Sequence, residues 1–337
     1  MKTLVAVALS SSVIMANSLV QEAQNAGLKA IPESQTELLK LIDNPKNPIT
    51  KEKVSLGKKL YFDPRLSKSG FISCNSCHNL SEGGDDAIEA AVGHKWRVNP
   101  HHLNSPTVYN AVFNDRQFWD GRSPDLEDQA QGPIQASPEM SATKSHVSET
   151  VNSIPAYVEE FQKAYGKDVK VSFEKITDTI GLFERTLVTP SAFDDFMNNV
   201  PNAMTKEQKN GLKTFIQVGC ASCHNGVGLG GGMNVLNVTA KYKYMDVGDF
   251  KGDENGMVRV PTLRNITQTA PYFHNGMVKT LSEAISEMAR IQLGKTLENK
   301  EVESIKTFLE ALDGRKPYME VPTLPASTDK TPLSDLN

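Results

Sequence analysis

Two copies of the pattern Cys-x-x-Cys-His constrain this chain more than any other feature of its sequence. They occupy residues 74–78 and 220–224 and contain all 4 cysteines of the 337-residue chain. The spacing of the cysteines alone fits a disulfide, a redox dithiol, a four-cysteine zinc site or a haem attachment site. The histidine after each pair separates these alternatives, because only haem attachment requires it.

Haem attachment uses both parts of the pattern. The two thiols add to the vinyl groups of the porphyrin, and the adjacent histidine then ligates the iron from one side. The sequence therefore predicts two covalently bound c-type haems, with zinc or disulfides as the alternatives. The attachment and ligand residues are Cys74, Cys77 and His78 for the first haem and Cys220, Cys223 and His224 for the second.

The N-terminal residues are typical of a secretory signal peptide. One lysine precedes an apolar run, and small residues follow around Ala16 to Ser18. The run is shorter than the roughly 20 residues of a membrane-spanning helix, and the alternatives are a buried helix or a short anchor. We expect a signal peptide over about residues 1–22, export to the periplasm and no membrane span after its removal. Free cysteines persist poorly in such an oxidising compartment, and haem attachment removes them.

The composition restricts the kinds of partner. The formal net charge is −4 and 39% of the residues are apolar, as in ordinary soluble domains that bury a sizeable core. A chain with this balance is neither a disordered segment nor a basic nucleic-acid binder. We therefore expect no nucleic-acid partner.

The sequence before each motif indicates two related units. "LGKKLYF" (56–62) precedes the first motif, "NGLKTFI" (210–216) precedes the second, and each is typical of a short amphipathic helix that leads into the attachment loop. We expect a mainly α fold with two cytochrome c-like haem domains and long loops between helices. The first domain would span residues 23–190 and the second residues 191–337.

Further helices are predicted where apolar residues recur at helical spacing. Long loops are expected at 79–122 and 226–280, and loops of this length are usually functional or wrapped around a cofactor. The tail from Val321 is rich in Pro, Ser and Thr and should be irregular. The expected helices are 145–166, 172–188, 280–293 and 299–312.

The ligand on the opposite side of each iron decides the chemistry. A haem with two strong protein ligands carries electrons, whereas a haem with an open face can bind an oxidant. His94 lies in a loop soon after the first motif, and Met288 lies on an apolar helix face, so a structural role is the alternative for both. Spacing does not choose among the 11 methionines and the remaining histidines. Those histidines are His94, His101, His102, His146 and His274.

Several longer stretches resemble the bacterial dihaem cytochrome c peroxidases. The resemblance runs from about residue 35 to about residue 320, in the same order as in that family, and these stretches have no general structural reason to occur together. They are "GFISCNSCHN", "VGHKW", "NSPTVYNAVFNDRQFWDGR", "DQAQGPIQASPEM", "VPTLRNITQTAPYFHNG" and "SEMARIQLG".

The resemblance implies different roles for the two haems. The first haem is similar to the low-potential, peroxidatic haem, and His94 matches the histidine that caps its iron at rest and leaves on activation. The second is similar to the high-potential haem that receives electrons from a donor, and Met288 matches its sixth ligand. Ligation by histidine and methionine raises the reduction potential, which suits electron entry.

The resemblance also implies three catalytic residues. Glu139 matches the acid–base residue beside the peroxide site, Gln129 its polar companion, and Trp119 the tryptophan between the haems. Splitting the O–O bond requires a proton moved from the inner to the outer oxygen, which a carboxyl group in a poorly solvated pocket can transfer. Without the resemblance, Glu139 would be interpreted as a solvated loop carboxylate and Trp119 as a core residue.

A calcium site is implied at the interface of the two domains. Asn104, Thr269 and Pro271 match its ligands, with one side-chain amide oxygen, two backbone carbonyls and water around a hard cation. His274 is expected near the second haem, at a propionate, and not as an iron ligand. The loop between His94 and Asn104 is about two residues longer than in some relatives. This difference from the family lies in the loop that carries both the displaceable iron ligand and one calcium ligand.

The matches imply an enzyme that reduces hydrogen peroxide to water. Its electrons would come from a small monohaem cytochrome c or a cupredoxin, and family members are generally homodimers. One alternative is a dihaem electron carrier, which would have no use for Glu139 and Gln129. Another is the related branch that modifies tryptophans of a partner protein, in which a tyrosine replaces the methionine ligand, and Met288 argues against it.

Overall fold

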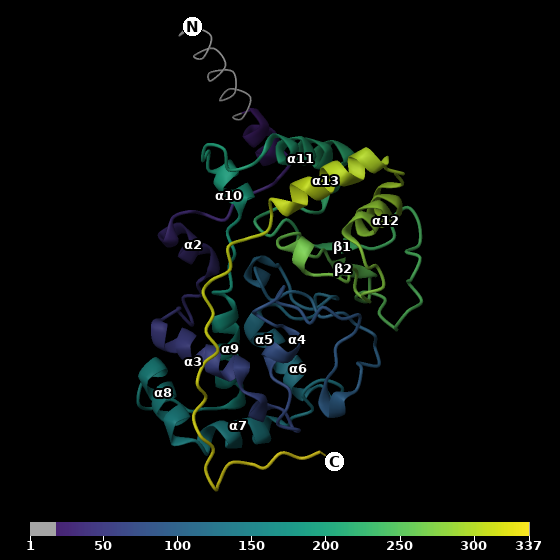
Figure 1. Ribbon diagram of the computed structural model, residues 1–337. Helices are drawn as coiled ribbons and strands as arrows, with labels where there is room; N and C mark the ends of the chain where they lie inside the picture. Colours follow the sequence, from purple (N-terminus) through teal and green to yellow (C-terminus); the bar gives the residue numbers. More distant parts are fainter. Residues whose placement is uncertain (1–17, 337) are drawn as a thin grey trace.

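Two packed helix pairs, each containing the helix that leads into a Cys-x-x-Cys-His motif, organise the fold (Figure 1). The computed structural model describes residues 18–336. In the lower half of Figure 1, α3 (Lys51–Phe62) packs on α9 (Phe173–Glu184). In the upper half, α11 (Lys206–Val218) packs on α13 (Asn299–Glu310). The helices expected before the two motifs are therefore confirmed.

A glycine permits close contact within each pair. A Cβ atom at Gly57 would clash with the carbonyl oxygen of Thr179, and one at Gly211 would clash with the carbonyl oxygen of Ser304. The helix backbones therefore approach each other more closely than a larger residue would allow. Gly57 and Gly211 occupy the same place in the two repeated stretches, so the repeat in the sequence is also a repeat of helix packing.

The remaining helices and a two-stranded ribbon complete a mainly α fold with little sheet, as expected. β1 and β2 are antiparallel, with Asn234 opposite Val258. Within residues 18–336 no helix is both long and apolar enough to cross a membrane. The bounds are α2 Gln35–Ile42, α4 Cys74–Cys77, α5 Leu126–Gln129, α6 Gln131–Gln135, α7 Lys144–Asn152, α8 Pro155–Tyr165, α10 Ala192–Met197, α12 Leu281–Leu293, β1 Met233–Val235 and β2 Met257–Arg259.

The predicted helix over residues 145–166 is wrong, because the structure has two helices there. α7 ends at Asn152, and α8 begins with Pro155 as its first residue. Proline has no N–H to continue a helix and disfavours helical backbone at the residue before it. Ile154 is accordingly extended, with φ −106° and ψ 102°. The expected helices near 172–188, 280–293 and 299–312 are present as α9, α12 and α13.

Buried apolar side chains form two large clusters. The first core contains residues from Leu56 to Leu187, and the second contains residues from Phe193 to Leu312. The first cluster ends at Leu187 and the second begins at Phe193, on either side of the expected boundary at residue 190. Residues 19–28 also belong to the second core. The N-terminal end of the described chain therefore packs against the half that is distant from it in sequence.

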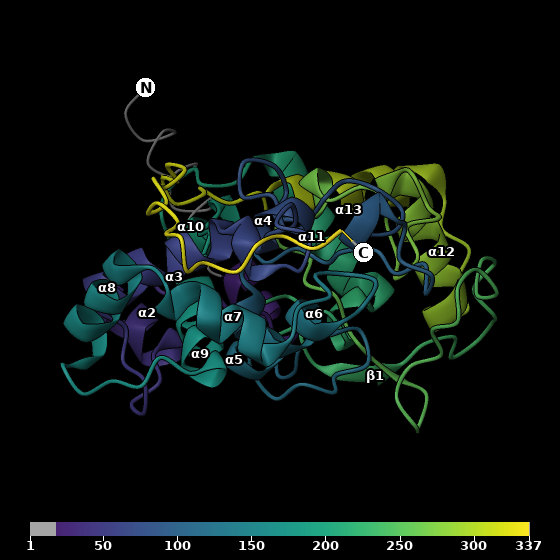
Figure 2. The ribbon, with the colours of Figure 1, turned by 90° about the horizontal axis from the view of Figure 1, so that it is seen from below.

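The C-terminal segment packs on the first half, although the helix before it belongs to the second. Residues 316–336 leave α13 and descend along the first half without regular structure, as expected for this tail (Figure 1). Seen from below, the last residues cross that half (Figure 2). Arg65 donates from Nη1 to the carbonyl oxygen of Pro325 at 2.9 Å, and the backbone N–H of Asp335 donates to the carbonyl oxygen of Lys68 at 2.8 Å.

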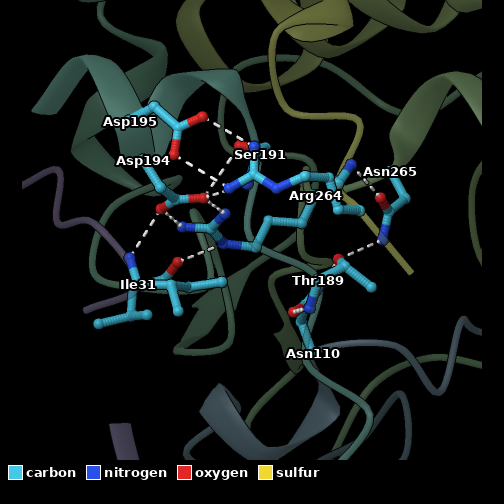
Figure 3. Close-up of polar contacts among 12 residues, drawn as sticks. Ile31, Asn110, Thr189, Ser191, Asp194, Asp195, Arg264 and Asn265 are labelled. Carbon is cyan, nitrogen blue, oxygen red and sulfur yellow. Dashed lines mark hydrogen bonds and ion pairs between the residues drawn. The ribbon is translucent and has the colours of Figure 1, made fainter. Parts of the chain in front are cut away.

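A buried threonine links the two halves where the chain passes between them (Figure 3). Asn110 and Asn265 each donate a side-chain N–H to Oγ1 of Thr189, at 2.7 and 2.9 Å. The backbone N–H of Thr189 donates in return to Oδ1 of Asn110 at 2.9 Å. Since all three residues are buried, unpaired amides here would be costly, and the set fixes the connection.

A buried ion pair lies just after this connection (Figure 3). Both terminal nitrogens of Arg264 donate to the carboxylate of Asp194, each at 2.8 Å. Asp194 also accepts from the backbone N–H of Ile31 at 2.6 Å and from that of Ser191 at 2.7 Å. The side chain of Arg264 is 0% exposed and that of Asp194 is 2% exposed. One carboxylate therefore joins three distant segments of the chain.

Removing the charge of Asp194 should destabilise the protein strongly. We expect Asp194→Asn to lower the free energy of unfolding by about 3–5 kcal/mol, because Arg264 would be left buried without a counter-charge. The adjacent Asp195 pairs with the exposed Arg315, so Asp195→Asn should cost no more than about 1 kcal/mol. Urea unfolding of both holoprotein variants measures the difference, and equal losses would contradict the assignment.

Candidate haem sites

The second motif opens into a large, mainly apolar cavity. The cavity has about 1580 Å³ of space not filled by atoms, part of it open to solvent. Cys220, Cys223, His224 and Met288 all line it, so the structure brings together the four residues that the sequence assigned to the second haem. The apolar wall comes from α11, α12 and α13. It includes Phe215, Leu281, Ile285, Leu293, Ile305 and Leu309.

His224 is held as a neutral imidazole by a backbone carbonyl. Its Nδ1 lies 3.3 Å from the carbonyl oxygen of Leu229. A carbonyl only accepts, so Nδ1 carries the proton and the lone pair is on Nε2. Burial lowers the pKa of His224 to about 4. A neutral imidazole oriented through Nδ1 is the usual form of a metal-ligating histidine, so this residue fits iron ligation.

Met288 reaches the same cavity from α12. The helix begins after Thr280, whose side chain accepts from the N–H of Glu283, and it ends at Gly294 in the left-handed conformation. These caps fix the length of the helix and the face that it presents. Met288 is half-buried and lines the cavity together with His224. A thioether and an imidazole in one cavity are a donor set that suits a haem iron.

The first motif repeats the design of the second. Cys74 and Cys77 start and end α4, and His78 follows as its C-cap. Nδ1 of His78 lies 3.0 Å from the carbonyl oxygen of Pro106, and burial lowers the pKa of this histidine. The hydroxyl of Tyr61 donates to the carbonyl oxygen of His78 at 2.6 Å and fixes the backbone there. The ring of His78 is therefore oriented through Nδ1, as that of His224 is.

The loop that carries His94 lies against the first motif. The thiol of Cys77 is 3.9 Å from the carbonyl oxygen of Val92. His94 is 8% exposed, and its Nδ1 has no hydrogen-bond partner among the residues that the structure describes. Lys95 and Trp96 follow with φ of 61° and 56°. Two successive residues in the left-handed region store strain of about 1–3 kcal/mol each.

Glu139 is joined directly to this loop. Its carbonyl oxygen accepts from the backbone N–H of His94 at 2.6 Å. Burial raises the pKa of the Glu139 carboxyl, while the positive charges of Arg122 and His101 lower it. The structure thus brings His94 and Glu139 together. Gln129 is half-buried at the end of α5, and no hydrogen bond within residues 18–336 joins its side chain to Glu139.

Asn99 is a site residue that the sequence did not reveal. It is buried, and its side-chain N–H lies 3.5 Å from Oε1 of Glu139, at the long limit of a hydrogen bond. Asn99 lies in the loop that is longer than in some relatives. That extra length is the one feature of the sequence that could have directed attention to it.

Trp119 and the expected calcium ligands lie on the wall of the second cavity. Trp119, Asn104, Thr269 and Pro271 all line it. Nε1 of Trp119 donates to the carbonyl oxygen of Asn104 at 2.9 Å. The side-chain nitrogen of Asn104 donates to the carbonyl oxygen of Ile88 at 2.7 Å, and no N–H or O–H in the described chain donates to its Oδ1. The residues expected from the sequence to ligate calcium therefore all line this cavity.

His274 lines the second cavity, and no hydrogen bond in the described chain joins it to the second motif. Its carbonyl oxygen accepts from the backbone N–H of Asn104 at 2.8 Å, and its ring packs edge-on against Trp119 at 6.3 Å between centroids. Nε2 of His274 is buried with no partner among the described residues. Burial lowers the pKa of His274 to about 4.

The paired sites on a helical fold are those of a haem-binding redox protein. The chain belongs to the di-haem cytochrome c peroxidase family. Residues 51–202 match the model of that family. The cytochrome c551 peroxidase of Pseudomonas aeruginosa is 45% identical over 93% of this chain and 92% of its own length. That of Nitrosomonas europaea is 45% identical over 85% of this chain and 87% of its own length.

A solved structure supports the fold. A MauG-like protein associated with microbial copper homeostasis matches with a TM-score of 0.69 at 24% identity, over 81% of this chain and 92% of that one. The family and the peroxidase relatives together define this chain as an enzyme of the cytochrome c peroxidase type that uses haem. This outcome favours the peroxidase over the electron-carrier alternative.

Acidification should destabilise the protein through His274. Below pH 6.5 the unfolded chain binds a proton at this histidine that the folded protein does not bind until about pH 4. The free energy of unfolding should therefore fall by about 3 kcal/mol as the pH drops from 6.5 to 4. His274→Phe should remove this part of the pH dependence. Urea unfolding of the holoprotein at several pH values tests it, and an unchanged slope would be contrary evidence.

Proposed function

We propose that the protein reduces hydrogen peroxide to water in the periplasm, with one electron-entry haem and one peroxide-cleaving haem. The observation that supports this most is the asymmetry of the two sites. Both have a neutral histidine oriented by a backbone carbonyl. The second site has Met288 in its cavity, whereas the first has His94 on a strained loop bonded to Glu139.

Each haem would be held by its own motif. Cys74 and Cys77 would bind the first haem covalently with His78 on the iron, and the second motif would do the same. The haem supplies an iron that binds the oxidant at one site and stores an electron at the other. With Met288 as the second ligand, the second site favours the reduced state and suits electron entry.

Glu139 would move the proton that peroxide cleavage requires. Its carboxyl is poorly solvated, and burial raises its pKa, so it would hold and return a proton more readily than an exposed carboxylate. Gln129 would orient the peroxide through its amide without competing for the proton. The nearby Asn99 amide would hold the Glu139 carboxyl in position.

His94 would open the first site when the second is reduced. Its loop has two left-handed residues immediately after His94, and such strain favours a segment with two arrangements of similar energy. A change of charge at the second site would then shift the balance between them. Trp119 would carry electrons between the two sites. It lines the second cavity and donates to the backbone of Asn104 in the long loop after His94.

Calcium would stabilise the junction of the two halves. The free Oδ1 of Asn104 and the backbone oxygens of Thr269 and Pro271 provide the neutral oxygen ligands that calcium accepts, with water completing the shell. The described residues contain no group of three or more His, Cys, Asp or Glu side chains for a metal. A calcium site here would therefore depend on amide and carbonyl oxygens.

Export and partners are proposed from the sequence. The signal peptide falls mainly on residues 1–17, outside the described residues, and Leu19 and Val20 are buried in the second core. A leader that ends before Ser18 leaves those contacts intact. A small cytochrome c or a cupredoxin would supply the electrons, and the protein would act as a homodimer.

Turnover should depend on prior reduction by one electron. The calcium-loaded protein, fully oxidised, and a sample reduced by one electron are each mixed with a reduced small cytochrome c and peroxide. We expect immediate oxidation of the cytochrome only in the reduced sample. Equal rates would mean that His94 is not the resting cap, and no turnover in either sample would refute the proposed reaction.

Removing the acid of Glu139 should abolish most of this turnover. We expect Glu139→Gln to lower the rate by about 10²–10⁴-fold, the usual contribution of general acid–base catalysis. Both haems should remain attached, as a pyridine haemochrome assay would verify. Glu149, on α7, provides the control, because Glu149→Gln changes a carboxylate for which the structure shows no link to the first motif. Wild-type turnover in Glu139→Gln would exclude Glu139 as the acid.

Replacing Met288 should lower the potential of the second haem. We expect Met288→His to shift it down by more than about 59 mV, a tenfold change in the one-electron equilibrium, because imidazole stabilises ferrous iron less than a thioether does. Met257 is half-buried on β2 but does not line the cavity, so Met257→His is the matched control. A redox titration that gives both variants the wild-type potential would remove Met288 from the ligand set.

A further inference from the structure

Arg259 is a buried cation in the wall of the second cavity. It is the last residue of β2, where the two halves of the molecule meet (Figure 1). The residue is 3% exposed and lines the cavity that contains His224 and Met288. The site described above gives it no role.

The backbone around Trp119 holds Arg259 in place. Its backbone N–H donates to the carbonyl oxygen of Trp119 at 2.8 Å. Its Nε donates to the carbonyl oxygen of Phe118 at 3.0 Å. The guanidinium carbon lies 5.8 Å from the centre of the Trp119 ring. These contacts use only Nε, so the two terminal nitrogens remain available.

No acidic side chain in the described part of the chain neutralises Arg259. No carboxylate within residues 18–336 forms an ion pair with it, and no acceptor there bonds its terminal nitrogens. Burial alone lowers its pKa to about 10, without an opposing carboxylate. Arg264 shows the contrast, because it is equally buried five residues later and is fully paired with Asp194.

A buried guanidinium without a counter-charge is costly, by several kcal/mol even after relaxation. An anion in the cavity of the haem-loaded protein would offset this cost. A haem carries two propionate groups, and arginine binds a carboxylate through two parallel N–H donors. The cavity contains the second haem motif, so such a carboxylate would enter with the haem.

We propose that Arg259 binds a propionate of the haem held by the second motif and joins that propionate to Trp119. The inference rests on the proposed function, since it requires a haem in this cavity. Arg259 is then a positioning residue. It keeps the propionate ionised, stabilises the reduced haem by its charge, and connects the haem edge to the ring and backbone of Trp119.

Redox titration of the second haem tests this role. The variants are Arg259→Gln, which removes the charge, and Arg259→Lys, which keeps it. Arg116→Gln is the control, because Arg116 is an exposed arginine in the same loop as Trp119. Haem content is measured first. Fewer than two haems in the wild-type protein would refute the proposed function itself, independently of Arg259.

Arg259→Gln should make the second haem about tenfold less reduced at fixed potential and pH 8, a shift of about 59 mV for one electron. The buried propionate without its cation should also take up a proton as the pH falls. The potential of this variant should therefore depend more steeply on pH between 5 and 8 than that of the wild type. Arg259→Lys should restore most of the potential, and Arg116→Gln should leave it within about twofold of wild type.

Two outcomes would overturn the proposal. One is an Arg259→Gln variant with the potential and pH profile of the wild type. The other is an Arg259→Lys variant shifted as far as Arg259→Gln, which indicates a packing role. If Arg259→Gln does not fold, a crystal structure of the wild-type holoprotein decides. A propionate oxygen within about 3.2 Å of a terminal nitrogen of Arg259 is expected, and solvent or a protein acceptor in that place refutes it.

Discussion

The relative position of the two halves depends on polar groups buried where the chain passes between them. Thr189 accepts from one asparagine in each half, and Asp194 binds Arg264 while accepting from the backbone of Ile31. Hydrogen bonds at a surface tolerate displacement, because water replaces lost partners, but these groups have no such alternative. These groups consequently hold the two halves, and with them the two motifs, in a fixed relative position.

Rigidity at this junction contrasts with the loop around His94. His78 and His224 are oriented in the same manner by backbone carbonyls, so the two motifs share one local arrangement. They differ in the residues that lie near them. Met288 belongs to a well-capped helix, whereas His94 precedes two left-handed residues. The proposed division between electron entry and peroxide cleavage rests on this difference.

The sequence predicted the elements that local chemistry controls. Apolar periodicity predicted α9, α12 and α13. The proximity of Met288 and His224 was predicted only through the family resemblance. Pro155 was the local signal that the helix over 145–166 had to break, and the apolar periodicity concealed it. Asn99 and Arg259 were not predicted. Both lie outside helices, and their partners, Glu139 and Trp119, are 40 and 140 residues away, so nothing in the local sequence indicates the contact.

The ends of the chain pack on opposite halves, and this affects the order of assembly. Residues 19–28 complete the second core, which otherwise consists of residues after 192, while the C-terminal segment lies on the first half. Neither half can therefore be finished from a contiguous piece of chain. In an N-terminal fragment that contains only the first motif, the apolar residues among 19–28 would have no second core to pack against. During synthesis, residues 19–28 therefore stay exposed until the residues after 192 have been made.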